Sequence, residues 1–232
     1  MRNNTSIQNV KEISKVLLHT VPIQCDNPWG IVQHPFVQHT VAMDRKGNFF
    51  NLLVEEDKNK WFSFIEKEID SADIKTIFYI MVTTPWKLTW LKFVKPYLSS
   101  QDFSKFLSDA WTTEDNPNMD VNVSIPEAIS WFKEADKKCL MDEEEYKYWE
   151  SLPDEITLYR GVSTGRAKYG LSWTNDEEIA RWFQKRFSVD GSKGQLLKVV
   201  ASKKNCLCYL DRGEKEIVLD VNAVKREITV IE

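Results

Sequence analysis

The chain has 232 residues, of which 42% are hydrophobic, 28% charged and 12% aromatic, and its formal net charge is −4. This composition supplies one generous core or two modest ones and excludes an intrinsically disordered chain. The acidic balance argues against a protein whose main role is to neutralise the phosphate backbone of a nucleic acid.

The sequence contains no evident targeting signal. The first 25 residues lack the continuous apolar core of a signal peptide, and the longest apolar run, Ile77 to Val82, is far shorter than a membrane span. The spacing of Cys25, Cys139, Cys206 and Cys208 matches neither a zinc knuckle nor a redox pair. These features predict a cytoplasmic protein with reduced thiols and no contact with a membrane.

Residues 1–152 have the pattern of a mainly helical region. A β-hairpin is expected in residues 36–54, around Arg45-Lys46-Gly47-Asn48. Apolar stripes predict helices over residues 61–69, after Thr84-Pro85, and most clearly over Ser100 to Trp111. The stretch from Thr112 to Asn122 resembles a loop.

Two further helices are expected over Ser124 to Met141 and Asp142 to Leu152, with Ser124 and Asp142 as caps. Aromatic residues on helical apolar faces are expected to be core residues and not ligand-stacking ones. This applies to Trp61, Trp86, Trp90, Trp111 and Trp131.

Residues 153–232 consist of short β-rich runs with one helix, over residues 176–187. The strands cluster and do not alternate with helices, which favours a mixed or antiparallel sheet. We therefore expect an α+β fold, with a helical N-terminal region and a C-terminal β-sheet core.

Glu214 and Glu216 precede the apolar run Ile217-Val218-Leu219. In strand geometry both carboxylates point the same way. Such a pair is often just a solvated strand face, but a strand buried on both faces would place it at the edge of a cleft. Carboxylates there can stabilise a cationic sugar or accept a proton.

Arg160 follows a predicted strand and precedes Gly161, which lets a ligand or another backbone approach closely. The guanidinium suits a phosphate, and a structural salt bridge is the alternative. Ser172 and Thr174 flank Trp173 on a strand that leads into a helix. Alone, that segment predicts only a capped amphipathic helix.

Together these segments resemble the motifs of the ADP-ribosyltransferase superfamily, in its arginine–serine–glutamate branch. Tyr159-Arg160 is similar to the aromatic–arginine motif of that branch. Ser172-Trp173-Thr174, followed by the helical residues Ala180 to Phe183, is similar to its Ser-x-Ser/Thr motif. Glu214-Lys215-Glu216 is similar to its Glu-x-Glu motif. Trp173 departs from the small polar residue that many members have. The resemblance covers about residues 153–232, which it marks as the catalytic core.

The resemblance implies a mono-ADP-ribosyltransferase that moves ADP-ribose from NAD+ to a protein side chain, with arginine as the expected acceptor, and releases nicotinamide. The expected acceptor belongs to a host or competitor protein. The whole chain also resembles small proteins carried by phages and other mobile elements of low-GC Gram-positive bacteria. The implied chemistry needs no metal.

The resemblance also assigns roles to residues. Arg160 would hold a phosphate or ribose of NAD+, Ser172 would orient the ribose, and Glu216 would bind the ribose 2′-hydroxyl and stabilise the cationic sugar. Glu214 would position or deprotonate the acceptor. Residues implied to form the NAD+ pocket are Tyr159, Arg160, Gly161, Ser172, Trp173, Thr174, Phe183 and Glu216.

Two other functions stay open. An NAD+ glycohydrolase shares the first chemical step and uses water as the acceptor. A non-catalytic interaction module would keep the fold without the activity. The oligomeric state and the role of the helical half are also open.

Overall fold

The computed structural model describes residues 3–187 and 194–232. The chain forms two compact units, Met1–Phe106 and Leu107–Glu232, and the division falls inside helix α5 (Ser100–Thr113). The change from helices to strands near Pro153 therefore lies within the second unit. In the described residues, no helix has the length and apolar character that crossing a membrane requires.

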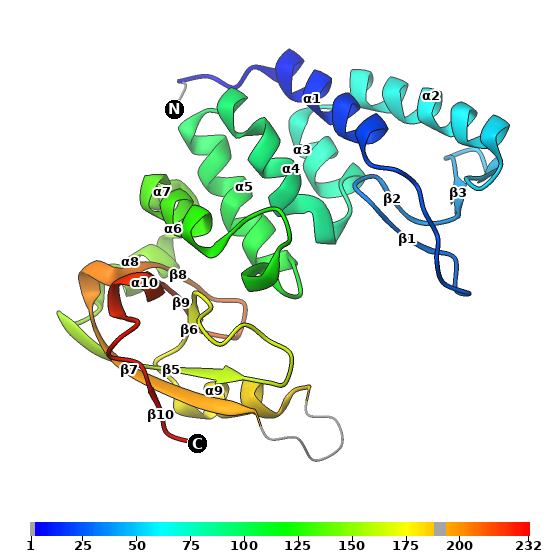
Figure 1. Cartoon of the computed structure of the whole chain (residues 1–232). Coiled ribbons are helices and arrows are strands. Elements are labelled where there is room, and N and C mark those ends of the chain that lie inside the picture. Colours follow the sequence, from blue (N-terminus) through cyan, green and yellow to red (C-terminus); the bar gives the residue numbers. More distant parts are fainter. Residues whose placement is uncertain (1–2, 188–193) are drawn as a thin grey trace. The chain divides into compact units, whose positions relative to one another are not determined.

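The first unit is mainly helical around an aromatic core (Figure 1). The ring centroids of Phe78, Trp90 and Phe106 lie 4.6–6.0 Å apart. The elements of this unit before α5 are α1 (Ile7–Thr20), β1 (Ile31–His34), β2 (Val37–His39), β3 (Val41–Met43), β4 (Phe49–Asn51), α2 (Glu55–Ser71), α3 (Ile74–Thr76), η1 (Ile77–Met81), η2 (Thr84–Trp86), α4 (Lys87–Val94) and η3 (Lys95–Tyr97).

The expected hairpin is present as the antiparallel pair β3–β4. The carboxylate of Asp44 accepts hydrogen bonds from the backbone N–H groups of Lys46 and Asn48, at 2.8 and 2.9 Å, and so orders the turn. A second antiparallel pair, β1–β2, precedes it and was not expected.

The second unit combines helices with two small sheets. Its elements after α5 are η4 (Pro117–Met119), α6 (Ile125–Glu134), α7 (Lys137–Leu140), α8 (Glu143–Ser151), β5 (Glu155–Val162), β6 (Ser172–Trp173), α9 (Glu177–Lys185), β7 (Gln195–Ser202), η5 (Lys203–Asn205), β8 (Cys206–Leu210), β9 (Glu216–Leu219), α10 (Val221–Val224) and β10 (Thr229–Val230).

The helix expected over residues 124–141 is two helices. Ala135 is extended, and the carboxylate of Asp136 caps α7 by accepting a hydrogen bond from the backbone N–H of Lys138. The two expected caps are confirmed, because Ser124 caps α6 and Asp142 forms a capping box with Glu145 at α8.

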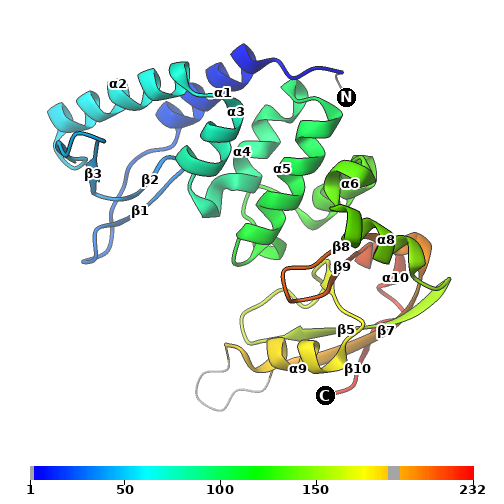
Figure 2. The ribbon, with the colours of Figure 1, turned by 180° about the vertical axis from the view of Figure 1, so that it is seen from behind.

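Among the described residues of this unit, the strands form two three-stranded antiparallel sheets, in the orders β10-β7-β5 and β6-β9-β8. A backbone bridge between Tyr159 and Thr174 joins them, with N–H to carbonyl distances of 2.7 and 2.9 Å. The fold is therefore α+β with small antiparallel sheets. Figures 1 and 2 show α9 running alongside β5 and β7.

Helix α9 packs closely against β5 at Gly161. A Cβ atom on this residue would lie 1.8 Å from the carbonyl oxygen of Ala180 and 2.4 Å from the amide nitrogen of Gln184. The close approach that the glycine permits is thus made by the backbone of α9.

Candidate functional site

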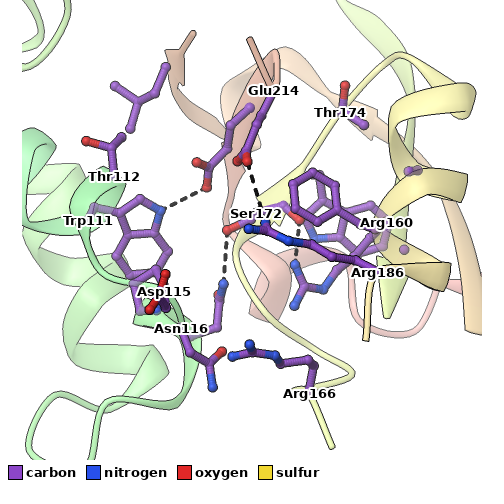
Figure 3. A pocket seen from close by; sticks show the side chains of 18 of the residues that line it. Trp111, Thr112, Asp115, Asn116, Arg160, Arg166, Ser172, Thr174, Arg186 and Glu214 are labelled. Atoms are coloured by element: carbon purple, nitrogen blue, oxygen red, sulfur yellow. Dashed lines mark hydrogen bonds and ion pairs between the residues drawn. The ribbon is translucent and has the colours of Figure 1, made fainter. Parts of the chain in front are cut away.

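The second unit contains a pocket of about 300 Å³, lined by residues from α5, α9 and the strands β5, β6 and β9 (Figure 3). This volume is at the small end of the range of ligand pockets. The pocket brings together every site residue that the sequence analysis proposed: Tyr159, Arg160, Gly161, Ser172, Trp173, Thr174, Phe183, Glu214 and Glu216.

Glu216 opens β9 and extends its half-buried carboxylate into the pocket. Its Oε1 accepts a 2.8 Å hydrogen bond from the indole Nε1 of Trp111. Burial raises the pKa of Glu216, whereas hydrogen bonds from Ser172 and Trp111 lower it. Two hydrogen-bond donors therefore hold the carboxylate in place, and burial reduces its contact with water.

Ser172 is itself positioned by Asn118. The side-chain Nδ2 of Asn118 donates to Ser172 Oγ at 2.9 Å, and its Oδ1 accepts from the backbone N–H of Leu171 at 2.5 Å. Gly170 makes room for this contact, because a Cβ there would lie 2.6 Å from Asn118 Oδ1. Asn118 thus holds the start of β6 and directs the serine hydroxyl.

Arg160 is buried, with 8% of its surface exposed. Its Nη1 donates to the carbonyl of Ser172 at 2.7 Å and its Nη2 to that of Ala167 at 2.9 Å. Its Nε has no hydrogen-bond partner among the described residues, and burial lowers the pKa of the guanidinium to about 10. In this structure Arg160 holds the backbone of β6, and its proposed contact with a phosphate stays a prediction.

Glu214 lies in the turn before β9, at the rim of the pocket. Lys215 has a φ of +46°, in the left-handed region, so the strand geometry that we expected to align Glu214 with Glu216 begins only at Glu216. Lys215 Nζ forms a 3.0 Å ion pair with Asp176, the cap of α9. This pair ties the turn to the helix, and both glutamates still line the pocket.

Two arginines flank the ring of Phe187 at the pocket. The Cζ of Arg166 is 4.5 Å from the ring centroid, and that of Arg186 is 5.1 Å from it. Arg186 also forms a 3.8 Å ion pair with Glu214. Arg166 forms no such pair with any described carboxylate, and a guanidinium in a pocket is suited to bind an anionic ligand.

The remaining proposed residues have mainly structural contacts. Trp173 is buried, and its Nε1 donates to the carbonyl of Gly170 at 2.9 Å. The hydroxyl of Thr174 accepts from the backbone N–H of Asp176 at 3.2 Å, which links β6 to the start of α9. Tyr159 joins the sheets through its backbone.

Two residues that contact the site, Trp111 and Asn118, were not predicted from the sequence. Trp111 was interpreted only as a core residue, and although it is 1% exposed it also donates to Glu216. Asn118 lies in the stretch interpreted as a loop, and a single asparagine in a polar loop is too common to be singled out. Both contact residues far along the chain, so no local pattern reveals them.

Comparisons with protein-family models, with curated proteins and with solved structures gave no match. The proposal below therefore rests on the residues of the pocket.

Proposed function

We propose that the second unit is an NAD+-dependent mono-ADP-ribosyltransferase that transfers ADP-ribose to a protein side chain, with arginine as the expected acceptor. One observation carries the proposal. The guanidinium of Arg160, the hydroxyl of Ser172 and the carboxylate of Glu216, from three separate strands, meet at one pocket with Glu214 at its rim.

The arrangement of strands supports the finer proposal that residues 153–232 form a core of the ADP-ribosyltransferase type. The three motifs that resemble that superfamily lie on β5, on β6 and at the start of β9. The bridge between Tyr159 and Thr174 joins the sheet of the first motif to the sheet of the other two.

The residues of the pocket fit NAD+ in charge, and the pocket volume fits half of the molecule. Glu216 can accept a hydrogen bond from a ribose hydroxyl, and the guanidinium of Arg166, which pairs with no described carboxylate, suits a phosphate. The ring of Phe183 offers an apolar face to nicotinamide. A volume of about 300 Å³ suits the nicotinamide riboside half, which leaves the adenosine half outside the pocket.

Cleavage of the bond between ribose and nicotinamide sends its electron pair to nicotinamide and builds positive charge on the ribose. The ionised carboxylate of Glu216 stabilises that charge, because its position is fixed before the reaction by Trp111 and Ser172. Glu214, at the rim, can orient the incoming nucleophile and accept its proton.

The direct test incubates the full chain with labelled NAD+ and a lysate, and measures both protein labelling and nicotinamide release. Glu216→Gln should lose both activities, and Glu227→Gln, an exposed glutamate outside the pocket, should keep both. Glu214→Gln should lose labelling and keep nicotinamide release. Absence of both activities from the unsubstituted protein would refute the proposal.

One observation favours hydrolysis as a second candidate. Arg186 already pairs with Glu214, and it thereby competes with another protein's side chain for this carboxylate. A glycohydrolase would release free ADP-ribose in the same amount as nicotinamide, with or without lysate. The third alternative, a non-catalytic module, predicts that calorimetry detects no binding at millimolar NAD+.

A further inference from the structure

The rim of the pocket contains an arginine from the same chain. Arg186 follows the last turn of α9, and its Nη1 lies 3.8 Å from Oε1 of Glu214. The two side chains are 39% and 48% exposed, so both remain accessible. Figure 3 shows the Arg186 side chain extending across the pocket toward Glu214.

Aromatic rings hold the guanidinium in this place. The Cζ of Arg186 is 4.9 Å from the centroid of Trp182, 5.8 Å from that of Phe183 and 5.1 Å from that of Phe187. Stacking of this kind orients a guanidinium without using its N–H groups. Apart from Glu214, no described carboxylate forms an ion pair with Arg186.

The other arginines of the pocket are placed differently. Arg160 is buried and bonded to two carbonyl groups. Arg212 pairs with Asp109 at 3.2 Å. Arg166 lines the pocket but forms no ion pair with Glu214 or any other described carboxylate. Arg186 is therefore accessible at the rim of the pocket, is oriented by aromatic rings and lies beside the carboxylate of Glu214.

We propose that Arg186 is an acceptor of its own chain's reaction, so that the protein transfers ADP-ribose from NAD+ to Arg186. This inference rests on the proposed function of the pocket. A bond forms between a terminal nitrogen of Arg186 and C1′ of the ribose, and the bond between C1′ and nicotinamide breaks. Its electron pair leaves with nicotinamide, which becomes neutral.

The proton balance assigns a role to Glu214. Arginine is protonated in proteins, so the attacking nitrogen must lose a proton as it forms the new bond. The carboxylate of Glu214, beside that nitrogen, accepts the proton and passes it to water. The product then carries two phosphates at the rim of the pocket, where they hinder the approach of any other acceptor.

The test uses the full chain with NAD+ and no other protein, followed by proteolysis and mass spectrometry. The expected result is one ADP-ribose on Arg186. Arg186→Lys should abolish it, while Arg181→Lys, on the same helix but outside the pocket, should leave it unchanged. The rate constant should not depend on protein concentration, because the transfer is intramolecular.

A second variant keeps Arg186 and removes its proton acceptor. Glu214→Gln should slow the modification of Arg186 by about 10²-fold, the lower end of what a general base contributes. Circular dichroism should show that both variants keep the fold. An undiminished rate in a folded Glu214→Gln protein would overturn the assignment.

The two proposals fail in distinguishable ways. Release of nicotinamide without modification of Arg186 overturns self-modification and leaves the proposed function intact. Faster labelling of lysate proteins by Arg186→Lys, with no modification of the unsubstituted chain, would show that Arg186 only blocks the pocket, which also overturns it. Absence of nicotinamide release under every condition removes both proposals.

Discussion

The indole Nε1 of Trp111 donates a 2.8 Å hydrogen bond to Oε1 of Glu216, a residue 105 positions further along the chain. Burial raises the pKa of this carboxylate, and the bond from Trp111 acts in the opposite direction. The tryptophan therefore helps to keep the central carboxylate of the pocket ionised. It does so from a helix whose sequence pattern shows only an apolar face.

The first prediction concerns pH. Trp111→Phe keeps a ring beside Phe132, whose centroid is 5.1 Å from that of Trp111, but removes the N–H donor. The pKa of Glu216 should then rise further. Because the proposed reaction requires Glu216 as the anion, nicotinamide release should fall as the pH drops through this pKa. The acid limb of nicotinamide release should therefore move to higher pH, by about one unit for each ~1.4 kcal/mol of lost interaction.

Trp131→Phe provides the control, because Trp131 is also buried but does not line the pocket. This variant should leave the acid limb in place. An acid limb that does not move in Trp111→Phe would show that the indole does not influence the titration of Glu216.

The second prediction separates positioning from folding at Asn118. Asn118→Ala leaves the N–H of buried Leu171 without an acceptor, so the free energy of unfolding should fall by about 1–3 kcal/mol. Asn118→Asp keeps that acceptor but replaces the donor to Ser172 by a charge. It should keep most of the stability and still release nicotinamide more slowly at neutral pH.

Urea unfolding and nicotinamide release measure the two effects at Asn118 separately. Asn222→Ala, at an exposed position of α10, serves as the control and should change neither quantity. If Asn118→Asp were as active as the unsubstituted protein, the hydrogen bond to Ser172 would have no part in the reaction.

The third prediction concerns the phosphate groups of NAD+. Arg166→Ala removes the pocket guanidinium that lacks a described carboxylate partner. Loss of a charge-assisted contact of about 1.5–3 kcal/mol should weaken NAD+ binding by about 10- to 150-fold. Calorimetry should show unchanged binding of nicotinamide, which has no phosphate. Arg226 is an exposed arginine outside the pocket, so the control variant Arg226→Ala should bind NAD+ normally. If Arg166→Ala weakened the binding of nicotinamide as much as that of NAD+, the assignment of Arg166 to a phosphate would be contradicted.

Local sequence signals predicted much of the fold of the second unit. Alternating apolar residues and turn residues placed β5 and β7, and Asp176 marked the start of α9, because strand periodicity and helix capping depend on neighbours in the chain. The break between α6 and α7 was not predicted, since the apolar pattern continues through Ala135.

The candidate site was only partly predictable. Arg160, Ser172 and Glu216 could be singled out because each lies beside a short apolar strand in an order that resembles one superfamily. Trp111 and Asn118 could not be found in this way, since their polar partners depend on how distant segments pack. The prediction that Glu214 and Glu216 lie on one strand was wrong, because Lys215, a non-glycine residue, adopts a left-handed conformation and β9 begins only after it.

The fourth prediction concerns the contact that places α9 against β5. In Gly161→Ala the new methyl group would overlap the backbone of Ala180 and Gln184, and backbone atoms cannot turn aside as a flexible side chain can. The helix must move away from the strand, so the free energy of unfolding should fall by about 1–3 kcal/mol. In Gly165→Ala the new methyl group would meet no atom of the described residues within 4 Å, but Gly165 has a φ of +78°, so this variant isolates the cost of backbone strain, about 1–2 kcal/mol. Because α9 carries Phe183 and is followed by its C-cap residue Arg186, which also lines the pocket, Gly161→Ala should also reduce NAD+ binding, whereas Gly165→Ala should affect stability alone. Urea unfolding with calorimetry would check both, and normal NAD+ binding by Gly161→Ala would show that the position of α9 does not control the pocket.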